Sequence, residues 1–486
     1  MVAETSTEVA EQPSVKGLTF TCTLGFIFPL LALLLLIRPQ DDADLWWHIR
    51  SGQVMSQTGD VIRADPFSFT KAGVFRTHHE WLSEPVMAWL YDTFGHTGNI
   101  LWVMLYVPLT VWLAFRLGKG NLVARALILI AGCAAASISW TARTHLVMPL
   151  LGLLIYGVTV RWRARLWFIP LIVLAWVNLH GSWMVAYLIA GAAGAGELWQ
   201  IARKTGGDPA YLRRLIFWCV VSLPMLLLNP YGFDQLYAVI DTAKMAALPY
   251  IEDWKPPVFT NPQYIPFALM LAICAATLIF ARRHISPARV LIVLGLSAWA
   301  LTTGRVVALH GLVTAVICGD ALAAWLEARG SLKPIKEEVS PSQTRLRVIL
   351  IGVLALAVIG RFIQQTQPEI IRATLSKTMP VEAVDYLLEA RPPHNIFNEY
   401  NWGGYLILYA PEYPVFMDGR ADLYDEFFTP YFDVVNVRGD WRGTLDQWDV
   451  RTILTYTDGV LAGVLRAEPS WTLAHQDALA VIYTRP

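Results

Sequence analysis

The chain has 486 residues, of which 55% are hydrophobic and only 16% are charged. Its 38 basic and 38 acidic residues balance, so the sequence lacks the strong positive charge that nucleic-acid-binding proteins use. The apolar residues form repeated long runs, which is typical of a polytopic membrane protein. All five cysteines fall within these runs, so neither a disulfide nor a thiolate metal site is predicted.

Eleven apolar segments are candidates for membrane-spanning helices, although several are shorter than the roughly 20 residues that cross a bilayer comfortably. They cover residues 18–37, 100–117, 122–139, 146–160, 166–179, 184–198, 215–228, 264–281, 288–301, 306–325 and 346–363. The first run is longer than the apolar part of a signal peptide and no small-residue cleavage site follows it, so we expect a retained helix. The run 184–198 is the weakest, but its Ala and Gly residues favour close helix packing.

Lys and Arg collect in every second loop, which predicts that these loops lie in the cytoplasm. We therefore expect a cytoplasmic tail, a transmembrane domain and an outer C-terminal domain at residues 1–17, 18–363 and 364–486. The transmembrane domain is expected to contain two long outer loops, at 39–99 and 229–263, and a cytoplasmic linker at 327–344.

Two stretches of the first outer loop, 44–55 and 85–94, are predicted to be amphipathic helices lying in the membrane interface. The tail has a more polar composition and is large enough for one small core. Its apolar spacing predicts helices at 381–390, 423–437 and 460–467, and strands at 414–417, 451–456, 472–475 and 479–483. The predicted fold class is therefore a polytopic α-helical membrane protein of about 11 transmembrane helices with a C-terminal soluble α/β domain.

The first outer loop carries two polar clusters. Asp42 and Asp44 follow the first apolar run directly, and His78, His79 and Glu80 lie near the end of the loop. Carboxylates at a membrane face are costly to desolvate, so a functional role is the first hypothesis for them. This pattern predicts chemistry at the end of a transmembrane helix on a lipid-borne substrate.

Several motifs support this layout: GQVMSQTGD in the first loop, NLHGSW at 178–183, NPYG at 229–232, IEDWKPP at 251–257, and NEYNWGGYL with FMDGRADLY in the tail. With them, nearly the whole chain resembles the GT-C class of integral-membrane glycosyltransferases. Within that class it is similar to the protein mannosyltransferase and lipid A aminoarabinose transferase branch. No sugar-specific motif is recognisable.

The resemblance implies a multi-pass protein of the bacterial inner membrane whose active face and C-terminal domain are periplasmic. It implies a polyprenyl-phosphate-linked sugar as donor and an envelope lipid, glycan or protein as acceptor. In the resembling enzymes an aspartate at this point of the first loop assists the acceptor. Asp44 matches that position best by its distance from the following GD pair, and Asp42 is expected to share the task. Glu80 is the third candidate catalytic residue.

Each of these residues also has a simpler interpretation. Asp42 or Asp44 would serve as the N-cap of a helix that begins at Leu45. His48 lies four residues after Asp44, so the two side chains would share a helix face and form a hydrogen bond, or hold a divalent cation such as Mg²⁺ or Mn²⁺. The resemblance to mannosyl and aminoarabinosyl transferases implies that no metal is obligatory.

A departing lipid phosphate needs cations on the outer face. The candidates at predicted outer helix ends are Arg143 with His145, His180, and Arg305. A planar guanidinium binds phosphate through two hydrogen bonds. The alternative is that these side chains reach lipid headgroups or pair with Glu252 or Asp253 in the second long loop.

His48, His79, Glu252 and Asp253 are expected to contact the acceptor or to order the loops, although a solvated turn is the simpler interpretation of the last two. In the tail, the turn Asp418-Gly419-Arg420 follows a predicted strand, and Gly403-Gly404 permits a close backbone approach. We expect the tail to pack on the outer loops rather than to bind glycan. Two further functions remain open: a flippase or transporter of lipid-linked glycans, and a non-enzymatic envelope assembly protein.

Overall fold

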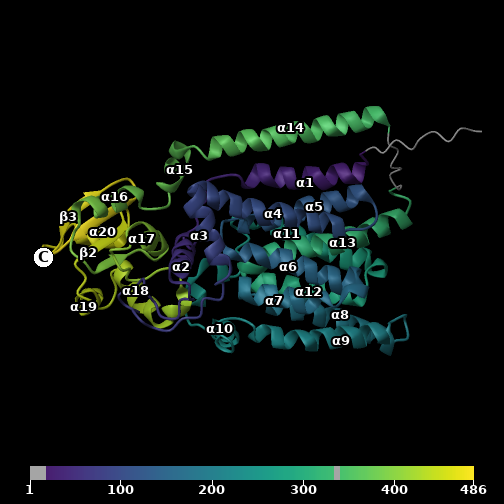
Figure 1. Ribbon diagram of the computed structural model, residues 1–486, viewed down its shortest axis with the longest axis horizontal. Coiled ribbons are helices and arrows are strands. Elements are labelled where there is room, and N and C mark those ends of the chain that lie inside the picture. The colour runs from purple at the N-terminus through teal and green to yellow at the C-terminus, as the bar shows by residue number, and fades with distance from the viewer. Residues whose placement is uncertain (1–17, 243, 333–339) are drawn as a thin grey trace, which may run out of the picture.

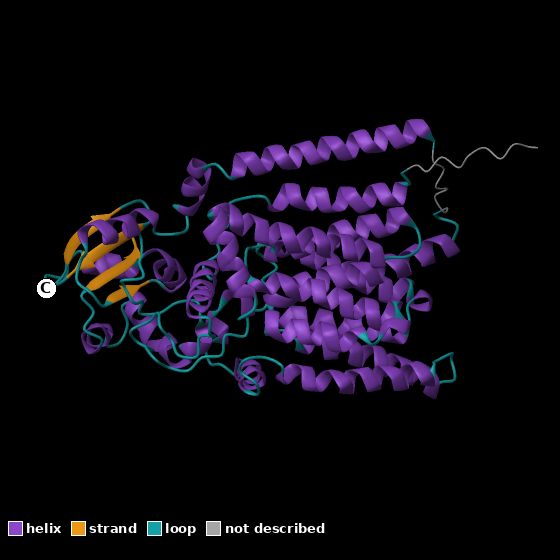
Figure 2. Cartoon of the chain, in the orientation of Figure 1, coloured by secondary structure: helices purple, strands orange, loops and turns teal. Residues whose placement is uncertain are grey.

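The computed structural model describes residues 18–242, 244–332 and 340–486. Long helices lie roughly parallel in a bundle, and a smaller part with the sheet sits at one end of it (Figure 1). We call this the domain end of the bundle, and the opposite end the far end. Among the described residues, strands occur only in the smaller part (Figure 2).

The helices of the bundle and its loops are α1 Phe20–Leu36, α2 Leu45–Thr58, α3 Ser83–Phe94, α4 His96–Leu117, α5 Leu122–Ala136, α6 Val147–Tyr156, α7 Phe168–Leu179, α8 Met184–Ala202, α9 Pro209–Ser222, α10 Asp234–Thr242, α11 Ile265–Phe280, α12 Pro287–Thr302, α13 Val307–Ala328 and α14 Pro341–Gln365. The C-terminal domain contains α15 Pro368–Leu375, α16 Val381–Ala390, α17 Gly403–Tyr409, α18 Phe428–Val435, α19 Trp441–Gln447 and α20 Val460–Leu465. Its strands are β1 Ile396–Asn398, β2 Thr452–Tyr456, β3 Thr472–Gln476 and β4 Ala480–Thr484.

The chain is a multi-pass membrane protein. All eleven predicted segments are helical, but length and apolar composition qualify only seven of the described segments as spans. These are His96–Leu117, Leu122–Ser139, Thr144–Arg161, Pro209–Leu227, Pro262–Phe280, Gly304–Ala328 and Pro341–Gln365. Helices α1, α7 and α12 are apolar but shorter, at 17, 12 and 16 residues. All eleven predicted segments thus form helices, but only some of these helices are long and apolar enough to count as spans.

Helix α13 lies at the centre of the bundle and is almost completely buried, whereas α14 lies along its edge and is almost completely exposed (Figure 1). Small residues allow the closest contact of α13. A Cβ atom at Gly132 of α5 would lie 2.5 Å from the carbonyl oxygen of Gly311. The predicted close packing of α8 is also present, because a Cβ atom at Gly196 would lie 2.2 Å from the backbone nitrogen of Ala288.

The two predicted amphipathic helices of the first loop are α2 and α3. They pack on each other at the domain end, between the bundle and the C-terminal domain (Figure 1). Their contact requires glycine at position 52, where a Cβ atom would lie 2.1 Å from the backbone oxygen of Glu84. The loop after the first span is therefore a built structure rather than a flexible connection.

The C-terminal domain has a four-stranded mixed sheet in the order β1-β2-β4-β3. Strand β1 is parallel to β2, and β4 is antiparallel to both β2 and β3. The predicted strands after residue 450 are confirmed, but the strand expected at 414–417 is wrong. That segment makes only isolated bridges, from Val415 to Ser68 and to Ile396. Because Val415 pairs with the first loop, the segment joins the two parts of the molecule instead of extending the sheet.

Candidate active site

Arg143 is the centre of a charged cluster at the domain end. It lies in the turn between α5 and α6, and its guanidinium meets three carboxylates: Asp44, Asp42 and Asp253. Its Nη1 atom is 2.5 Å from Asp253 Oδ2 and its Nε atom is 3.6 Å from Asp42 Oδ1. Two segments predicted separately, the first loop and the second long loop, therefore converge on one cation.

The local backbone holds Arg143 in place. The carbonyl oxygen of Arg143 accepts a hydrogen bond from Trp102 Nε1 at 3.0 Å, and Gln40 Oε1 accepts one from the backbone nitrogen of Ala142 at 2.9 Å. On the other side, Thr303 Oγ1 donates to the carbonyl oxygen of Asp253 at 3.2 Å. The second loop is thus tied to the turn between α12 and α13, where Arg305 lies.

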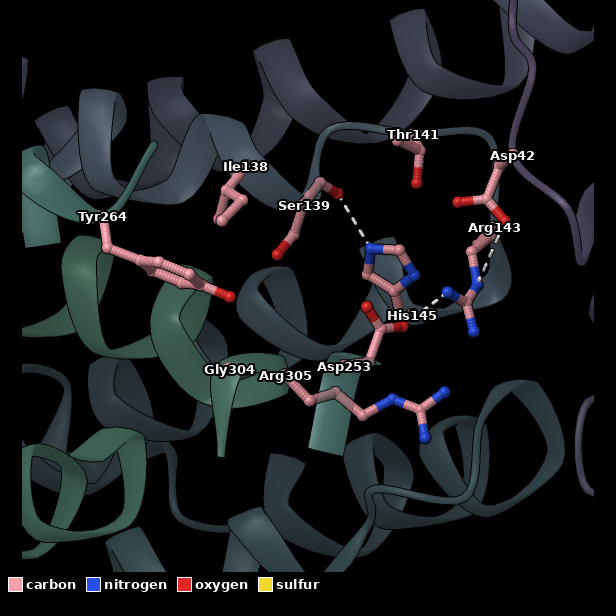
Figure 3. Close-up of a pocket in the computed structure, with 10 residues that line it drawn as sticks. All are labelled: Asp42, Ile138, Ser139, Thr141, Arg143, His145, Asp253, Tyr264, Gly304 and Arg305. Carbon is pink, nitrogen blue, oxygen red and sulfur yellow. Dashed lines mark hydrogen bonds and ion pairs between the residues drawn. The ribbon is translucent and has the colours of Figure 1, made fainter. Parts of the chain in front are cut away.

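Beside this cluster is a cavity of about 80 Å³ (Figure 3). It is lined by Asp42, Ile138, Ser139, Thr141, Arg143, His145, Asp253, Tyr264, Gly304 and Arg305. The cavity brings together Arg143, His145 and Arg305, which the sequence nominated as phosphate ligands. His180 and Asp44 do not line it.

The two arginines of the cavity have different surroundings. Arg143 is surrounded by carboxylates, whereas no described residue forms an ion pair with Arg305. The Arg305 guanidinium lies over the ring of Trp254, 5.2 Å from its centroid. A half-buried guanidinium that faces a cavity without a paired carboxylate is free to bind an anion.

Asp44 is held between the bundle and the C-terminal domain. Its Oδ2 atom contacts Arg143, and its Oδ1 atom accepts a hydrogen bond from Trp47 Nε1 at 3.1 Å. Burial raises the pKa of Asp44 to about 6; Arg143 opposes this effect and Asp42 adds to it. Asp253 behaves oppositely, because Arg143 holds its pKa well below the ordinary value.

The capping interpretation of Asp44 is wrong, since its side chain makes no capping hydrogen bond to α2. Asp42 instead orders the turn before the helix, where its Oδ1 atom accepts a hydrogen bond from the backbone nitrogen of Asp44 at 3.0 Å. The expected bond between Asp44 and His48 is also absent. His48 Nδ1 lies 3.0 Å from Glu84 Oε1, because α2 turns the imidazole toward α3.

Glu80 pairs with His79 at 2.9 Å and does not line the cavity. Burial alone would raise the pKa of Glu80, but His79, His48 and His180 together outweigh it and hold that pKa well below its ordinary value. Glu84 is different: burial and Glu80 raise its pKa well above the ordinary range. Burial therefore favours the protonated form of Glu84, which is bonded to His48, whereas the histidines around Glu80 favour its ionised form.

Of the remaining nominated residues, His180 lies beside His79, with ring centroids 6.4 Å apart, and Glu252 lies apart. His180 is buried and its Nδ1 atom lies 2.8 Å from Ser182 Oγ. Glu252 is exposed and pairs with Lys255 at 2.7 Å, so the solvated-turn interpretation holds for it and fails for Asp253. Among the described residues, no group of three or more His, Cys, Asp or Glu side chains is arranged to hold a metal ion.

Sequence reasoning missed how closely the C-terminal domain approaches Asp44. A Cβ atom at Gly419 would overlap Asp44 Oδ1, and one at Gly404 would lie 2.5 Å from the backbone oxygen of Ala43. The two glycine-containing motifs of the tail were the signal available in the sequence. The domain therefore forms one wall of the site, and the expected packing on the first loop is confirmed.

Buried ion pairs fasten this wall to the first loop. Arg420 lies between Asp65 and Asp418, and all three side chains are fully buried. Arg76 makes a two-pronged contact with Asp422, at 2.9 and 3.0 Å. The backbone of Phe67 accepts a hydrogen bond from that of Val415 at 3.0 Å.

No family model and no curated protein matches the sequence. Solved structures do match the fold. The oligosaccharyltransferase of Archaeoglobus fulgidus in the apo form aligns with a TM-score of 0.55 at 12% identity, over 90% of this chain and 69% of that one. ArnT from Cupriavidus metallidurans aligns with a TM-score of 0.50 over 95% of this chain and 97% of that one, at 14% identity in the apo state and 13% when bound to undecaprenyl phosphate. The chain thus has the fold of the GT-C glycosyltransferases.

Proposed function

We propose that the chain is a membrane glycosyltransferase that moves a sugar from a polyprenyl-phosphate donor to a hydroxyl group of an envelope acceptor. The observation that carries the proposal is the cavity at the domain end, which places the unpaired guanidinium of Arg305 beside the carboxylates held by Arg143. The match to ArnT bound to undecaprenyl phosphate supports a lipid phosphate as the donor's leaving group. The domain end would then be the periplasmic side of a bacterial inner membrane.

The proposed reaction is one displacement with inversion. The acceptor oxygen attacks the anomeric carbon, the bond from that carbon to the phosphate oxygen breaks, and the polyprenyl phosphate leaves with the electron pair. The acceptor proton passes to the Asp42–Asp44 pair, of which Asp42 faces the cavity and Asp44 has its pKa raised to about 6. Arg305 stabilises the charge that develops on the departing phosphate.

Arg143 has a different task in this proposal. Its contacts with three carboxylates leave it little capacity for a phosphate, so it positions the aspartates, and its charge favours the ionised form of Asp44. Glu80 and His79 pair with each other and do not line the cavity, so they would hold the first loop in shape rather than contact the reacting atoms. The C-terminal domain closes the acceptor side through Gly419.

The first test identifies the product. Envelope lipids, glycans and glycoproteins are compared by mass spectrometry in a deletion strain and in strains restored with wild type, Asp44→Asn or Asp42→Asn at matched protein level. We expect a sugar to disappear on deletion, to return with wild type, and to remain absent with at least one of the two variants. Full restoration by both variants would remove the aspartate pair as proton acceptor and turn the interpretation toward transport or assembly.

A further inference from the structure

Four charged side chains from four helices meet at the far end of the bundle, away from the candidate active site. Arg125 belongs to α5, Arg289 to α12 and Asp320 to α13, and Arg161 ends the π-helical turn that follows α6. We call these residues the far-end cluster. The start of α5 and α12 and the end of α6 all lie at this end (Figure 1). Nothing in the proposed sugar transfer uses them.

The charges of the far-end cluster do not balance. Asp320 Oδ2 contacts Arg161 Nη2 and lies 3.6 Å from Arg289 Nη1. Its other oxygen accepts a hydrogen bond from the backbone nitrogen of Lys119 at 2.6 Å. Arg125 packs against Gly319, the neighbour of Asp320, where a Cβ atom would lie 3.4 Å from its Cα atom. One carboxylate therefore faces two guanidinium groups. The guanidinium of Arg125 donates from Nη2 to the carbonyl oxygen of Phe115 at 3.0 Å and adds a third positive charge close enough to act on Arg161.

The arginines of the far-end cluster also have N–H groups that donate no hydrogen bond within the described part of the chain. The Nε atoms of Arg125, Arg161 and Arg289 are buried, and none has a hydrogen-bond acceptor among the described residues. The Arg161 side chain is only 5% exposed. A buried donor without an acceptor destabilises the protein, and the cost is greater for a charged group. An anion that accepts these N–H groups would remove that cost and neutralise the excess charge.

The geometry points to a phosphate. Planar guanidinium groups bind phosphate oxygens in pairs, and basic pockets between transmembrane helices bind the headgroups of anionic lipids. Arg125, Arg161 and Arg289 lie in the first or last turn of their helices, which is the depth at which a headgroup sits. We propose that the far-end cluster binds the phosphate of an anionic phospholipid from the leaflet at that end. This inference does not depend on sugar transfer.

The test uses the purified full chain in detergent, with bound lipids counted by native mass spectrometry and unfolding temperature measured in parallel. The probes are cardiolipin, phosphatidylglycerol, phosphatidylcholine and inorganic phosphate. The test variant is Arg125→Gln/Arg289→Gln, which leaves the Arg161–Asp320 pair intact. The control is Arg282→Gln/Arg283→Gln, which removes the same charge from exposed side chains near the start of α12.

We expect wild type to bind an anionic lipid at least tenfold more tightly than phosphatidylcholine, the test variant to lose that preference, and the control to keep it. Equal loss in both variants would reduce the effect to diffuse attraction and overturn the proposal. Equal stabilisation by inorganic phosphate would overturn the assignment to a lipid. If the test variant does not fold, Arg289→Lys replaces it; unchanged lipid preference in Arg289→Lys would overturn a role for the guanidinium group.

Discussion

Arg143 and Arg305 lie in one cavity but are expected to respond differently to the same substitution. Arg305→Gln removes a cation without an ion pair, so we expect at least tenfold weaker binding of polyprenyl phosphate and an unfolding temperature close to that of wild type. Arg143→Gln leaves three carboxylates without their shared cation, so we expect a loss of stability on the order of 3 kcal/mol.

The measurement is lipid-phosphate binding and thermal unfolding of both variants in one detergent. Lys255→Gln is the control, because that side chain is half-exposed and pairs only with Glu252 among the described carboxylates. An Arg305→Gln protein that binds polyprenyl phosphate as wild type does would remove Arg305 from the donor site.

The raised pKa of Asp44 predicts a pH profile. If Asp44 accepts the proton, it must be ionised, so kcat/KM should rise with pH and level off above about 6. Below that pH we expect a fall of roughly tenfold per unit, because the protonated acid cannot act as a base. The profile is measured with the donor and acceptor that the strain comparison identifies.

Asp42→Asn provides the check on this assignment. Asp42 raises the pKa of Asp44, so its neutral replacement should move the rising limb to lower pH while activity persists. A limb that stays in place would mean that a group other than Asp44 titrates. Complete loss of activity would assign the proton to Asp42 instead.

The sequence indicated which charged residues gather at the domain end, but it did not indicate which of them form pairs. Asp44, Arg143 and Arg305 were nominated because each was expected at an outer helix end, and the structure brings all three together at the domain end. The reasoning from sequence failed for His48, since the helical spacing from Asp44 says nothing about a competing acid on a second helix. Pairing across segments depends on tertiary packing, which a single sequence does not encode locally.

Among the elements, the turn that contains Gly419 is the most sensitive to change. A methyl group at this position would overlap the carboxylate of Asp44, so Gly419→Ala should displace either the turn or the aspartate. We expect a large loss of activity, on the order of tenfold or more, with the protein still folded. Activity per folded protein and the pH profile are the measurements, because a shifted Asp44 would also titrate differently.

Gly463→Ala in α20 is the matched control, since a Cβ atom there has no neighbour within 4 Å. It should be neutral or slightly stabilising, because alanine favours a helix by up to about 1 kcal/mol over glycine. Equal activity of the two variants would show that the turn does not position Asp44.

Helices were easier to predict than strands in this chain. The helix predicted at 381–390 is α16 with the same bounds, because its apolar spacing and its flanking residues agree. The segment 414–417 has the composition of a strand but pairs with Ser68 from the first loop, more than 300 residues away. The three-residue strand β1 was missed because it is too short to show a period.

The whole molecule is held together by more than its covalent connections. A protease site inserted at Thr366-Gln367, between α14 and α15, would cut the chain into 1–366 and 367–486. We expect the two fragments to elute together, because Asp65, Arg420 and Arg76 with Asp422 hold the domain on the first loop. Size-exclusion chromatography after cleavage is the measurement.

Arg420→Met is the variant to compare with the cleaved wild type. It leaves Asp65 and Asp418 buried without a cation, which costs about 3–5 kcal/mol. The fragments should then separate. If the fragments of the cleaved wild type separate, the covalent connection between α14 and α15 holds the domain in place, and the contacts with the first loop do not.

The same interface sets the order in which the molecule can mature. Position 44 belongs to the first tenth of the chain, yet Gly419 and Arg420, the ion-pair partner of Asp65, lie in the last fifth. Synthesis runs from the N-terminus at roughly 5–20 residues per second. The C-terminal domain is therefore synthesised tens of seconds after the first loop that it covers. During that interval Asp44 has no cover from the domain. A ribosome-bound or prematurely terminated chain would therefore reach the membrane without a working site, so completion of translation itself acts as the last step of assembly.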